Sequence, residues 1–228
     1  MSLNTISYLI HEIKTPLTGI IGITEVALEE EDASKNKSYL MDILNCAQRI
    51  SEIVGGLRSY SRITKKEEQS LVDIHKVLED SLEMVRLGIK VTSVEVIKRF
   101  QPVEKIEANM GEIQQVFTNL ITNAFQAMNG KEGRLILSTR SLKDSIEIKV
   151  SDNGIGIPQK HLNKIFDPFF TTKNPCEGMG LGLNIVYRII TKYMGTIDAE
   201  SKEGIGTTFT IKFPTKGDGN GKESIGRR

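Results

Sequence analysis

The stretch Asn119-Leu120-Ile121-Thr122-Asn123-Ala124 lies inside the strongest helical pattern of this 228-residue chain. The spacing of apolar residues predicts a helix over residues 110–128, with Asn109 as its N-cap. Its buried face is expected to contain Ile113, Phe117, Leu120, Ala124 and Met128. The opposite stripe is expected to contain Glu112, Gln115, Asn119, Asn123 and Gln126. Two asparagines one turn apart are unfavourable inside a helix compared with Glu, Lys or Gln, so they call for a reason beyond a solvated face.

Outward from this helix, strands and further helices are predicted on both sides. Strand patterns cover residues 70–74, 94–100, 103–107, 134–139 and 145–151, and a closing hairpin covers 196–201 and 207–213. Helical patterns cover residues 75–86 and 182–194. Because these elements mix without regular β-α-β alternation, we expect an α+β two-layer sandwich with helices on one face of a sheet.

The first 67 residues follow a different rule, a heptad spacing of apolar residues in two consecutive seams. The first seam contains Leu3, Ile6, Ile10, Ile13, Leu17, Ile20, Thr24 and Ala27; the second contains Leu40, Ile43, Ala47, Ile50, Val54, Leu57 and Ser61. We expect a helical hairpin whose turn lies near residues 32–36. Two helices cannot enclose a core alone, so a homodimeric four-helix bundle is favoured over packing of the hairpin on the rest of its own chain.

Composition narrows the function classes. The net charge of +1 gives no case for nucleic acid or membrane binding. Cys46 and Cys176 fit no metal spacing, and no apolar run reaches the roughly 20 residues that span a bilayer. We expect a soluble, cytoplasmic chain. An upstream sensor domain missing from the chain and a membrane anchor outside it are compatible with this expectation. The predicted domains are 1–67 and 68–214, with a disordered glycine-rich tail at 215–228.

Three more segments carry residue types suited to phosphoryl chemistry. His11-Glu12-Ile13-Lys14-Thr15-Pro16 places an imidazole beside an acid, and Thr15 lies one turn later on the same helix face. Asp152-Asn153-Gly154-Ile155-Gly156 combines a hydrogen-bond-accepting carboxylate with glycines that let a base approach the backbone. Gly178-Met179-Gly180-Leu181-Gly182-Leu183 is a glycine-rich turn at a helix N-terminus, which presents backbone N–H groups to anions.

Together and in this order, these segments resemble the transmitter region of sensor histidine kinases, which belong to the GHKL ATPase superfamily. The resemblance runs from about the first residue to Pro214. It implies a dimeric helical hairpin followed by a GHKL-type α+β sandwich. It also implies ATP and Mg²⁺ as cofactors, and the receiver domain of a response regulator as partner.

The resemblance also implies roles for individual residues. His11 is the phosphorylated histidine, Glu12 assists as a base, and Thr15 helps to position water when the partner is dephosphorylated. Asn119 and Asn123 lie in the segment whose second asparagine binds Mg²⁺. The remaining nucleotide contacts are expected from Asp152, Gly154, Gly156, Lys173, Gly178, Gly180, Gly182, Leu183 and Thr207. The chain departs from the family at Gln126 and Met179, where a basic residue and a hydroxyl residue are common.

Two other functions stay open from the sequence. A catalytically silent dimeric scaffold that binds a receiver domain would need the same hairpin but not an intact nucleotide site. Another GHKL ATPase would need the same sandwich but not the histidine segment at residues 11–16. The sequence does not decide whether phosphoryl transfer runs within one subunit or across the dimer.

Overall fold

The computed structural model describes residues 3–62, 69–88, 94–128, 132–172 and 180–215, without the side chains of residues 3–12, 48–49, 51–53 and 55–62. The chain forms two compact units. One contains Met1–Lys65 with Asp167–Gly182, and the other contains Lys66–Phe166 with Leu183–Arg228. Of the predicted disordered tail, Thr215 is described, and its backbone N–H donates to the Asp144 carbonyl at 3.1 Å. Residues 216–228 lie outside the described residues.

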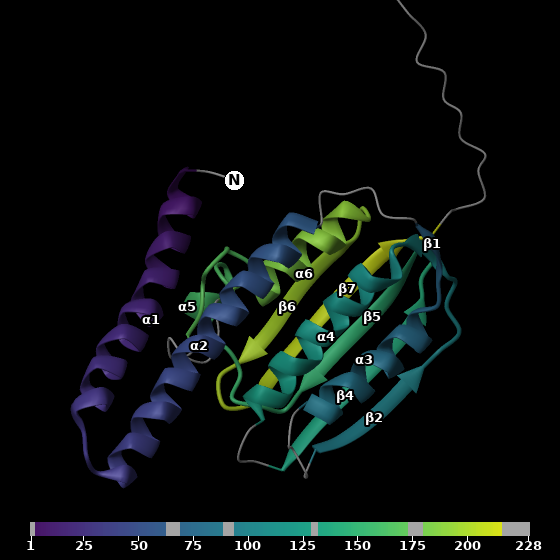
Figure 1. Ribbon diagram of the computed structural model, residues 1–228. Coiled ribbons are helices and arrows are strands. Elements are labelled where there is room, and N and C mark those ends of the chain that lie inside the picture. The colour runs from purple at the N-terminus through teal and green to yellow at the C-terminus, as the bar shows by residue number, and fades with distance from the viewer. Residues whose placement is uncertain (1–2, 63–68, 89–93, 129–131, 173–179, 216–228) are drawn as a thin grey trace, which may run out of the picture. The chain divides into compact units, whose positions relative to one another are not determined.

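The helical hairpin consists of α1 (Leu3–Glu29) and α2 (Ala33–Arg62), which run side by side (Figure 1). Helix α1 continues through Pro16, the one proline inside it. Among the described residues, no helix combines the length and apolar character that crossing a bilayer requires.

The turn of the hairpin comes earlier than the sequence predicted, because α2 already begins at Ala33. Asp32 is the reason. Its side-chain oxygen accepts hydrogen bonds from the Ser34 backbone N–H at 2.9 Å and from the Ser34 hydroxyl at 2.7 Å. The Asn36 N–H donates to the Asp32 carbonyl at 3.0 Å, the first bond of the helix. Asp32 therefore caps α2, and its acid is used at a helix start rather than at a helix end.

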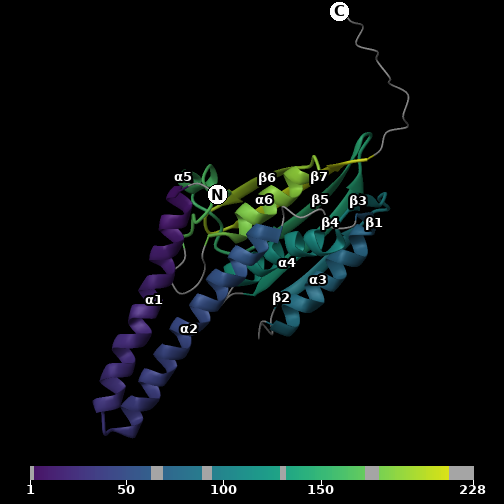
Figure 2. The ribbon, with the colours of Figure 1, turned by 45° about the horizontal axis from the view of Figure 1, so that its top comes forward.

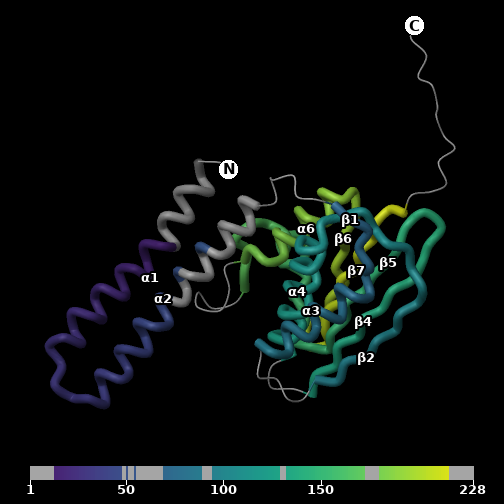
Figure 3. Tube along the Cα trace, turned by 45° about the vertical axis from the view of Figure 1, so that its right-hand side comes forward, coloured from purple at the N-terminus to yellow at the C-terminus, as the bar shows by residue number. Residues whose placement is uncertain are grey.

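The second unit contains a five-stranded mixed sheet in the order β2-β4-β5-β7-β6, in which only β2 and β4 pair in parallel. The strands are β2 (Val94–Phe100), β4 (Gly133–Ser141), β5 (Ser145–Asp152), β6 (Thr196–Lys202) and β7 (Gly206–Pro214). Helices α3 (Ile74–Gly88), α4 (Met110–Ala127) and α6 (Gly182–Lys192) cover one face of this sheet (Figures 2 and 3). The predicted α+β two-layer sandwich is confirmed.

A two-stranded antiparallel sheet of β1 (Ser70–Val72) and β3 (Ile106–Ala108) stands apart from the main sheet. The prediction of a strand over 70–74 was two residues too long, because Asp73 starts α3. Its side chain accepts from the His75 N–H at 3.0 Å, and its carbonyl accepts from the Val77 N–H at 3.1 Å. The predicted strand over 103–107 is shifted to Ile106–Ala108, because β1 offers only three residues to pair with.

Helix α4 packs its predicted apolar face into the core, together with alternate residues of the sheet. Ile113, Phe117, Leu120, Ala124 and Met128 are all buried, as the spacing predicted, and face a layer that includes Leu135, Leu137, Val150, Phe209 and Ile211. Asn109 caps the helix as predicted, and its side chain accepts from the Glu112 N–H at 3.0 Å. The short helix α5 (Gln159–Leu162) follows the loop after β5.

Glu112 is buried, although the sequence pattern placed it on the outward stripe of α4. Lys192 donates to both of its carboxylate oxygens at 2.7 Å, and the Tyr193 hydroxyl donates to one of them at 2.5 Å. The Asn109 N–H donates to that hydroxyl at 2.9 Å. These bonds join the start of α4 to the end of α6, and they compensate for the burial of a charged group.

We expect Tyr193→Phe to lower the free energy of unfolding by roughly 1.5–3 kcal/mol, because it removes a hydrogen bond to a buried carboxylate and leaves the Asn109 N–H without its acceptor. Urea denaturation of the whole chain measures this. Tyr187→Phe is the matched control, because Tyr187 lies on α6 and is 46% exposed; its effect should stay within about 0.5 kcal/mol. Equal effects of the two substitutions would contradict the role given to the buried hydroxyl.

Candidate functional site

The candidate site begins on α4, where Asn119 and Asn123 are half-buried one turn apart. The Asn119 Nδ2 atom is buried and has no hydrogen-bond partner among the described residues. A buried donor without a partner costs about 1–3 kcal/mol, so this atom is suited to an oxygen supplied by a ligand. The carboxamide oxygens on the same stripe suit a hard cation that shares phosphate oxygens.

The loop after β5 is held against the C-terminal end of α4, one turn beyond Asn123. The Ile155 N–H donates to the Ala127 carbonyl at 3.0 Å. A Cβ atom on Gly154 would lie 2.6 Å from that carbonyl oxygen, so any side chain there would force the loop away from the helix. Glycine at position 154 therefore allows the loop to pack directly against the end of α4.

Two further glycines let backbone segments pack directly against each other in this region. Gly156 and Gly206 have φ angles of +68° and +139°, which favour glycine. A Cβ atom on Gly156 would collide with the Lys202 carbonyl, and one on Gly206 would collide with the Asp152 carbonyl. The strands and the loop can approach this closely only because these positions carry no side chain.

Asp152 ends β5 and lies directly opposite Thr207 on β7. Burial raises the pKa of the Asp152 carboxyl above its ordinary value, and hydrogen bonds from the backbone N–H groups of Gly154 and Thr207 oppose this shift. The Gly154 N–H lies 2.8 Å from the Asp152 Oδ1 atom. An acceptor carboxylate held in a partly buried place is suited to reading an amino group of a ligand.

The sequence reasoning passed over three side chains that shape this region. Asn153 accepts from the Arg134 N–H at 2.7 Å and donates to the Glu132 carbonyl at 3.1 Å, which fixes the loop to β4. Ser201 lies opposite Thr207 on β6, with 2.9 Å between the two hydroxyl oxygens. Asn184 donates to the Phe166 carbonyl at 2.8 Å, while its Oδ1 atom is buried without a partner among the described residues. Asn153 lies inside the segment at residues 152–156 that the sequence analysis quotes, but no role follows for it or for the other two from local sequence, since each contacts another part of the chain.

The glycine-rich segment is only partly described. Gly182 is the first residue of α6, and Leu183 is half-buried. The backbone N–H groups of this first turn have no partner inside the helix, which suits them to an anion. Gly180 has a φ angle of +66° and its carbonyl accepts from the Phe169 N–H at 3.0 Å, both within the first unit. Lys173 and Gly178 lie outside the described residues.

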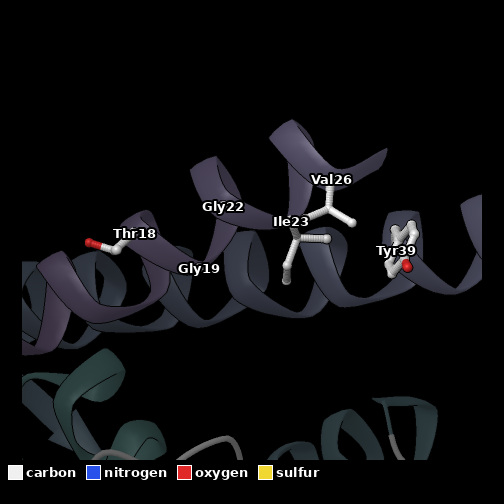
Figure 4. Close-up of a pocket in the computed structure, with 6 residues that line it drawn as sticks. All are labelled: Thr18, Gly19, Gly22, Ile23, Val26 and Tyr39. Atoms are coloured by element: carbon white, nitrogen blue, oxygen red, sulfur yellow. The ribbon is translucent and has the colours of Figure 1, made fainter. Parts of the chain in front are cut away.

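The histidine segment lies on α1, and the side chains of His11 and Glu12 lie outside the description. Thr15 is exposed. Positions 11, 15, 18, 22 and 26 share one face of a helix by their spacing. Thr18, Gly22 and Val26 of this face line a shallow hollow of about 300 Å³, together with Gly19 and Ile23 of α1 and Tyr39 of α2. Figure 4 shows these six residues.

Six predicted site residues lie on α4, β5, β7 and the loop after β5, all within the second unit: Asn119, Asn123, Asp152, Gly154, Gly156 and Thr207. The structure joins them through the end of α4, the loop after β5 and the start of β7. Gly180 and Gly182 belong to the first unit together with the hairpin.

Comparison with known proteins gives two family matches. Residues 2–66 match the His Kinase A (phospho-acceptor) domain, and residues 109–217 match the histidine kinase-, DNA gyrase B- and HSP90-like ATPase family. The matched segments contain His11 and the six site residues of the second unit respectively.

Curated relatives are similar over most of this chain. The signal transduction histidine-protein kinase AtoS of Escherichia coli K12 is 32% identical over 212 residues, covering 92% of this chain and 34% of that protein. The sensor histidine kinase ZraS of Klebsiella oxytoca is 33% identical over 210 residues, covering 91% of this chain and 45% of that protein. The chain thus spans less than half the length of these relatives.

Solved structures share the fold. Histidine kinase ThkA in complex with response regulator protein TrrA has a TM-score of 0.73 at 26% identity, covering 93% of this chain and 61% of that one. Acinetobacter baumannii histidine kinase AdeS has a TM-score of 0.70 at 24% identity, covering 91% of this chain and 98% of that one. With both family matches on one chain that is similar to these kinases over about nine tenths of its length, the chain belongs to the sensor histidine kinases and carries their transmitter region.

Proposed function

We propose that this chain is the kinase core of a two-component system, which phosphorylates its own His11 with ATP and passes the phosphoryl group to an aspartate of a response-regulator receiver domain. The observation that carries the proposal is the pairing of Asp152 with Thr207 across β5 and β7, next to a loop whose Ile155 N–H bonds to α4 one turn beyond Asn123. This arrangement supplies an acceptor for a purine amino group next to amides suited to phosphates and a cation.

One group of residues would contact the adenine of the nucleotide, and another group would contact its phosphates. Asp152 and Thr207 would contact adenine, beside a loop that Gly154 and Gly156 allow to pack against the backbone of α4 and β6. Asn119 and the N–H groups of the segment containing Gly178, Gly180, Gly182 and Leu183 would contact phosphates, joined by the Lys173 ammonium group. Mg²⁺, which Asn123 would help to hold, would neutralise negative charge on the phosphates.

The transfer itself is a substitution at phosphorus. A ring nitrogen of His11 forms a bond to the γ-phosphorus while the bond to the β–γ bridging oxygen breaks, and ADP leaves. Glu12 accepts the proton from the other ring nitrogen. A carboxylate of the receiver then attacks the phosphorus, the phosphorus–nitrogen bond breaks, and the imidazole regains a proton. The protein's share is chiefly positioning and charge stabilisation.

Assembly as a homodimer is part of the proposal, with residues 1–67 as the dimerisation and phosphoacceptor domain and 68–214 as the ATP-binding domain. Large apolar side chains of the predicted seams are exposed on the hairpin alone: Leu17 is 46% exposed, Leu40 64% and Val54 52%. A second copy would cover them in a four-helix bundle.

The receiver is proposed to dock over the hollow that contains Gly22 and Val26. The acceptor aspartate must reach His11, and the hollow continues the same helix face toward the turn of the hairpin. A Cβ atom on Gly22 would meet no atom within 4 Å, so this position leaves the surface open to a partner. Thr15, which is exposed and lies between positions 11 and 18 of this helix face, would help to hold a water for dephosphorylation of the receiver.

His11→Gln tests the proposed activity directly. We expect the variant to lose all labelling by γ-labelled ATP while it still binds ATP, because glutamine offers no nucleophilic nitrogen. The wild-type label should be acid-labile and stable to alkali, as a phosphoramidate is. His161→Gln is the matched control and should keep its label. Undiminished label in His11→Gln would overturn the assignment.

Asn123→Asp is expected to slow autophosphorylation on the order of a hundredfold, because a second negative charge would stand beside the phosphates where a neutral amide belongs. Folding should change little, since the side chain is only half-buried. Gln115→Glu makes the same amide-to-acid change about two turns earlier on α4 and should retain the wild-type rate. Full kinase activity of Asn123→Asp at ordinary Mg²⁺ would remove Asn123 from the mechanism.

Asp152→Asn should weaken ATP binding on the order of tenfold to a hundredfold, because it removes a charged acceptor. It should leave thermal stability unchanged or higher at neutral pH. The folded-state pKa of Asp152 is raised, so the folded protein binds more protons, and stability falls as pH rises through the window above the ordinary Asp value. The neutral amide avoids that loss. The stability difference between variant and wild type should therefore shrink as acid protonates Asp152; a growing difference would contradict the raised pKa.

A further inference from the structure

The Ser201 hydroxyl occupies a junction of three chain segments. Its oxygen accepts a hydrogen bond from the Ile157 N–H at 2.8 Å, in the loop after β5. It donates to the Gly206 carbonyl at 2.9 Å, at the start of β7. It also lies 2.9 Å from the Thr207 hydroxyl oxygen.

These three contacts fix which hydroxyl donates to which. Ile157 N–H can only donate and the Gly206 carbonyl can only accept, so the single proton of Ser201 is committed to Gly206. The Ser201 oxygen is then an acceptor toward both other groups. Thr207 must therefore be the donor in the hydroxyl pair, and its own proton points toward Ser201.

The consequence reaches Asp152 through the sheet register. Ser201 pairs with Thr207, and Thr207 pairs with Asp152, so these three side chains form one row on one face of β6, β7 and β5. With its proton turned to Ser201, Thr207 offers only lone pairs toward a ligand. An ionised Asp152 also only accepts.

We propose that Ser201 is a specificity-determining positioning residue, which orients the Thr207 hydroxyl so that the site presents acceptors only and selects purines with a 6-amino group over those with a 6-oxo group. An adenine amino group donates to such a site, whereas the guanine 6-oxygen would face unpaired acceptors. This inference rests on the proposed nucleotide site at Asp152 and Thr207.

Removal of the Ser201 hydroxyl has a distinctive expected effect. In Ser201→Ala the Thr207 hydroxyl can rotate and donate to a 6-oxo group. A purely structural tie between β6 and the loop would instead weaken both nucleotides equally, through loss of stability. The ratio of the dissociation constants for ATP and GTP separates these two roles, because a uniform loss of affinity cancels in it.

The experiment measures ATP and GTP binding to the whole chain by calorimetry. For Ser201→Ala we expect the preference for ATP over GTP to fall on the order of threefold to tenfold, the scale of one hydrogen bond. Ser201→Thr restores the hydroxyl and should restore the preference. Ser151→Ala is the matched control: it removes a serine that accepts from Thr208 at 2.9 Å on the other face of the same sheet, and it should keep the wild-type ratio.

Thr207→Val extends the test without disturbing the other two bonds of Ser201. In the Thr207→Val background, Ser201→Ala should leave the ratio of the ATP and GTP dissociation constants where Thr207→Val alone puts it, because no Thr207 hydroxyl remains to turn toward a 6-oxo group. A wild-type ratio in Ser201→Ala, or a fall in the double variant beyond that of Thr207→Val alone, would overturn the role of Ser201 alone. A wild-type chain that binds neither nucleotide would overturn the proposed function together with this inference.

Discussion

The contact between the end of α4 and the loop after β5 sets the geometry of the candidate site. The Ile155 N–H bonds to the Ala127 carbonyl, and Gly154 has no side chain to keep the two apart. Through this contact a helix that presents Asn123 and a strand that ends in Asp152 become neighbours. The buried face of α4 fixes the helix on the sheet, so a change in the core would move both groups together.

Much of this arrangement was predictable from the sequence, because long periodic segments encode it directly. Helix 110–128, its Asn109 cap and its buried face were predicted, and so was strand 94–100. The errors have two physical sources. Some residues have roles that a local pattern does not distinguish, such as an aspartate that caps a helix, and others depend on partners far along the chain. Asp32 and Asp73 both start helices that the sequence pattern began later. The burial of Glu112 and the role of Ser201 depend on partners far along the chain, at Lys192 and Ile157, which no local pattern reveals.

The second unit separates groups that stabilise it from groups that are held ready for ligands. At one end of α4, Glu112 is buried with every oxygen bonded by Lys192 or Tyr193. Farther along the same helix, Asn119 has a buried donor without a partner among the described residues, and burial raises the pKa of the Asp152 carboxyl. Sites that bind ligands commonly carry such local costs, while the rest of the fold compensates for them.

Because apolar side chains are exposed on the helical hairpin, the stability of the hairpin would depend on the concentration of the protein. Under the proposed pairing, the hairpin gains stability by mass action as the protomer concentration rises, whereas the sandwich has its own enclosed core and gains nothing. At low protein concentration, many chains would then have a folded sandwich and a hairpin without its second copy. Under the proposed pairing, the number of paired hairpins would rise more steeply than protein level, because each added protomer also helps to complete a partner.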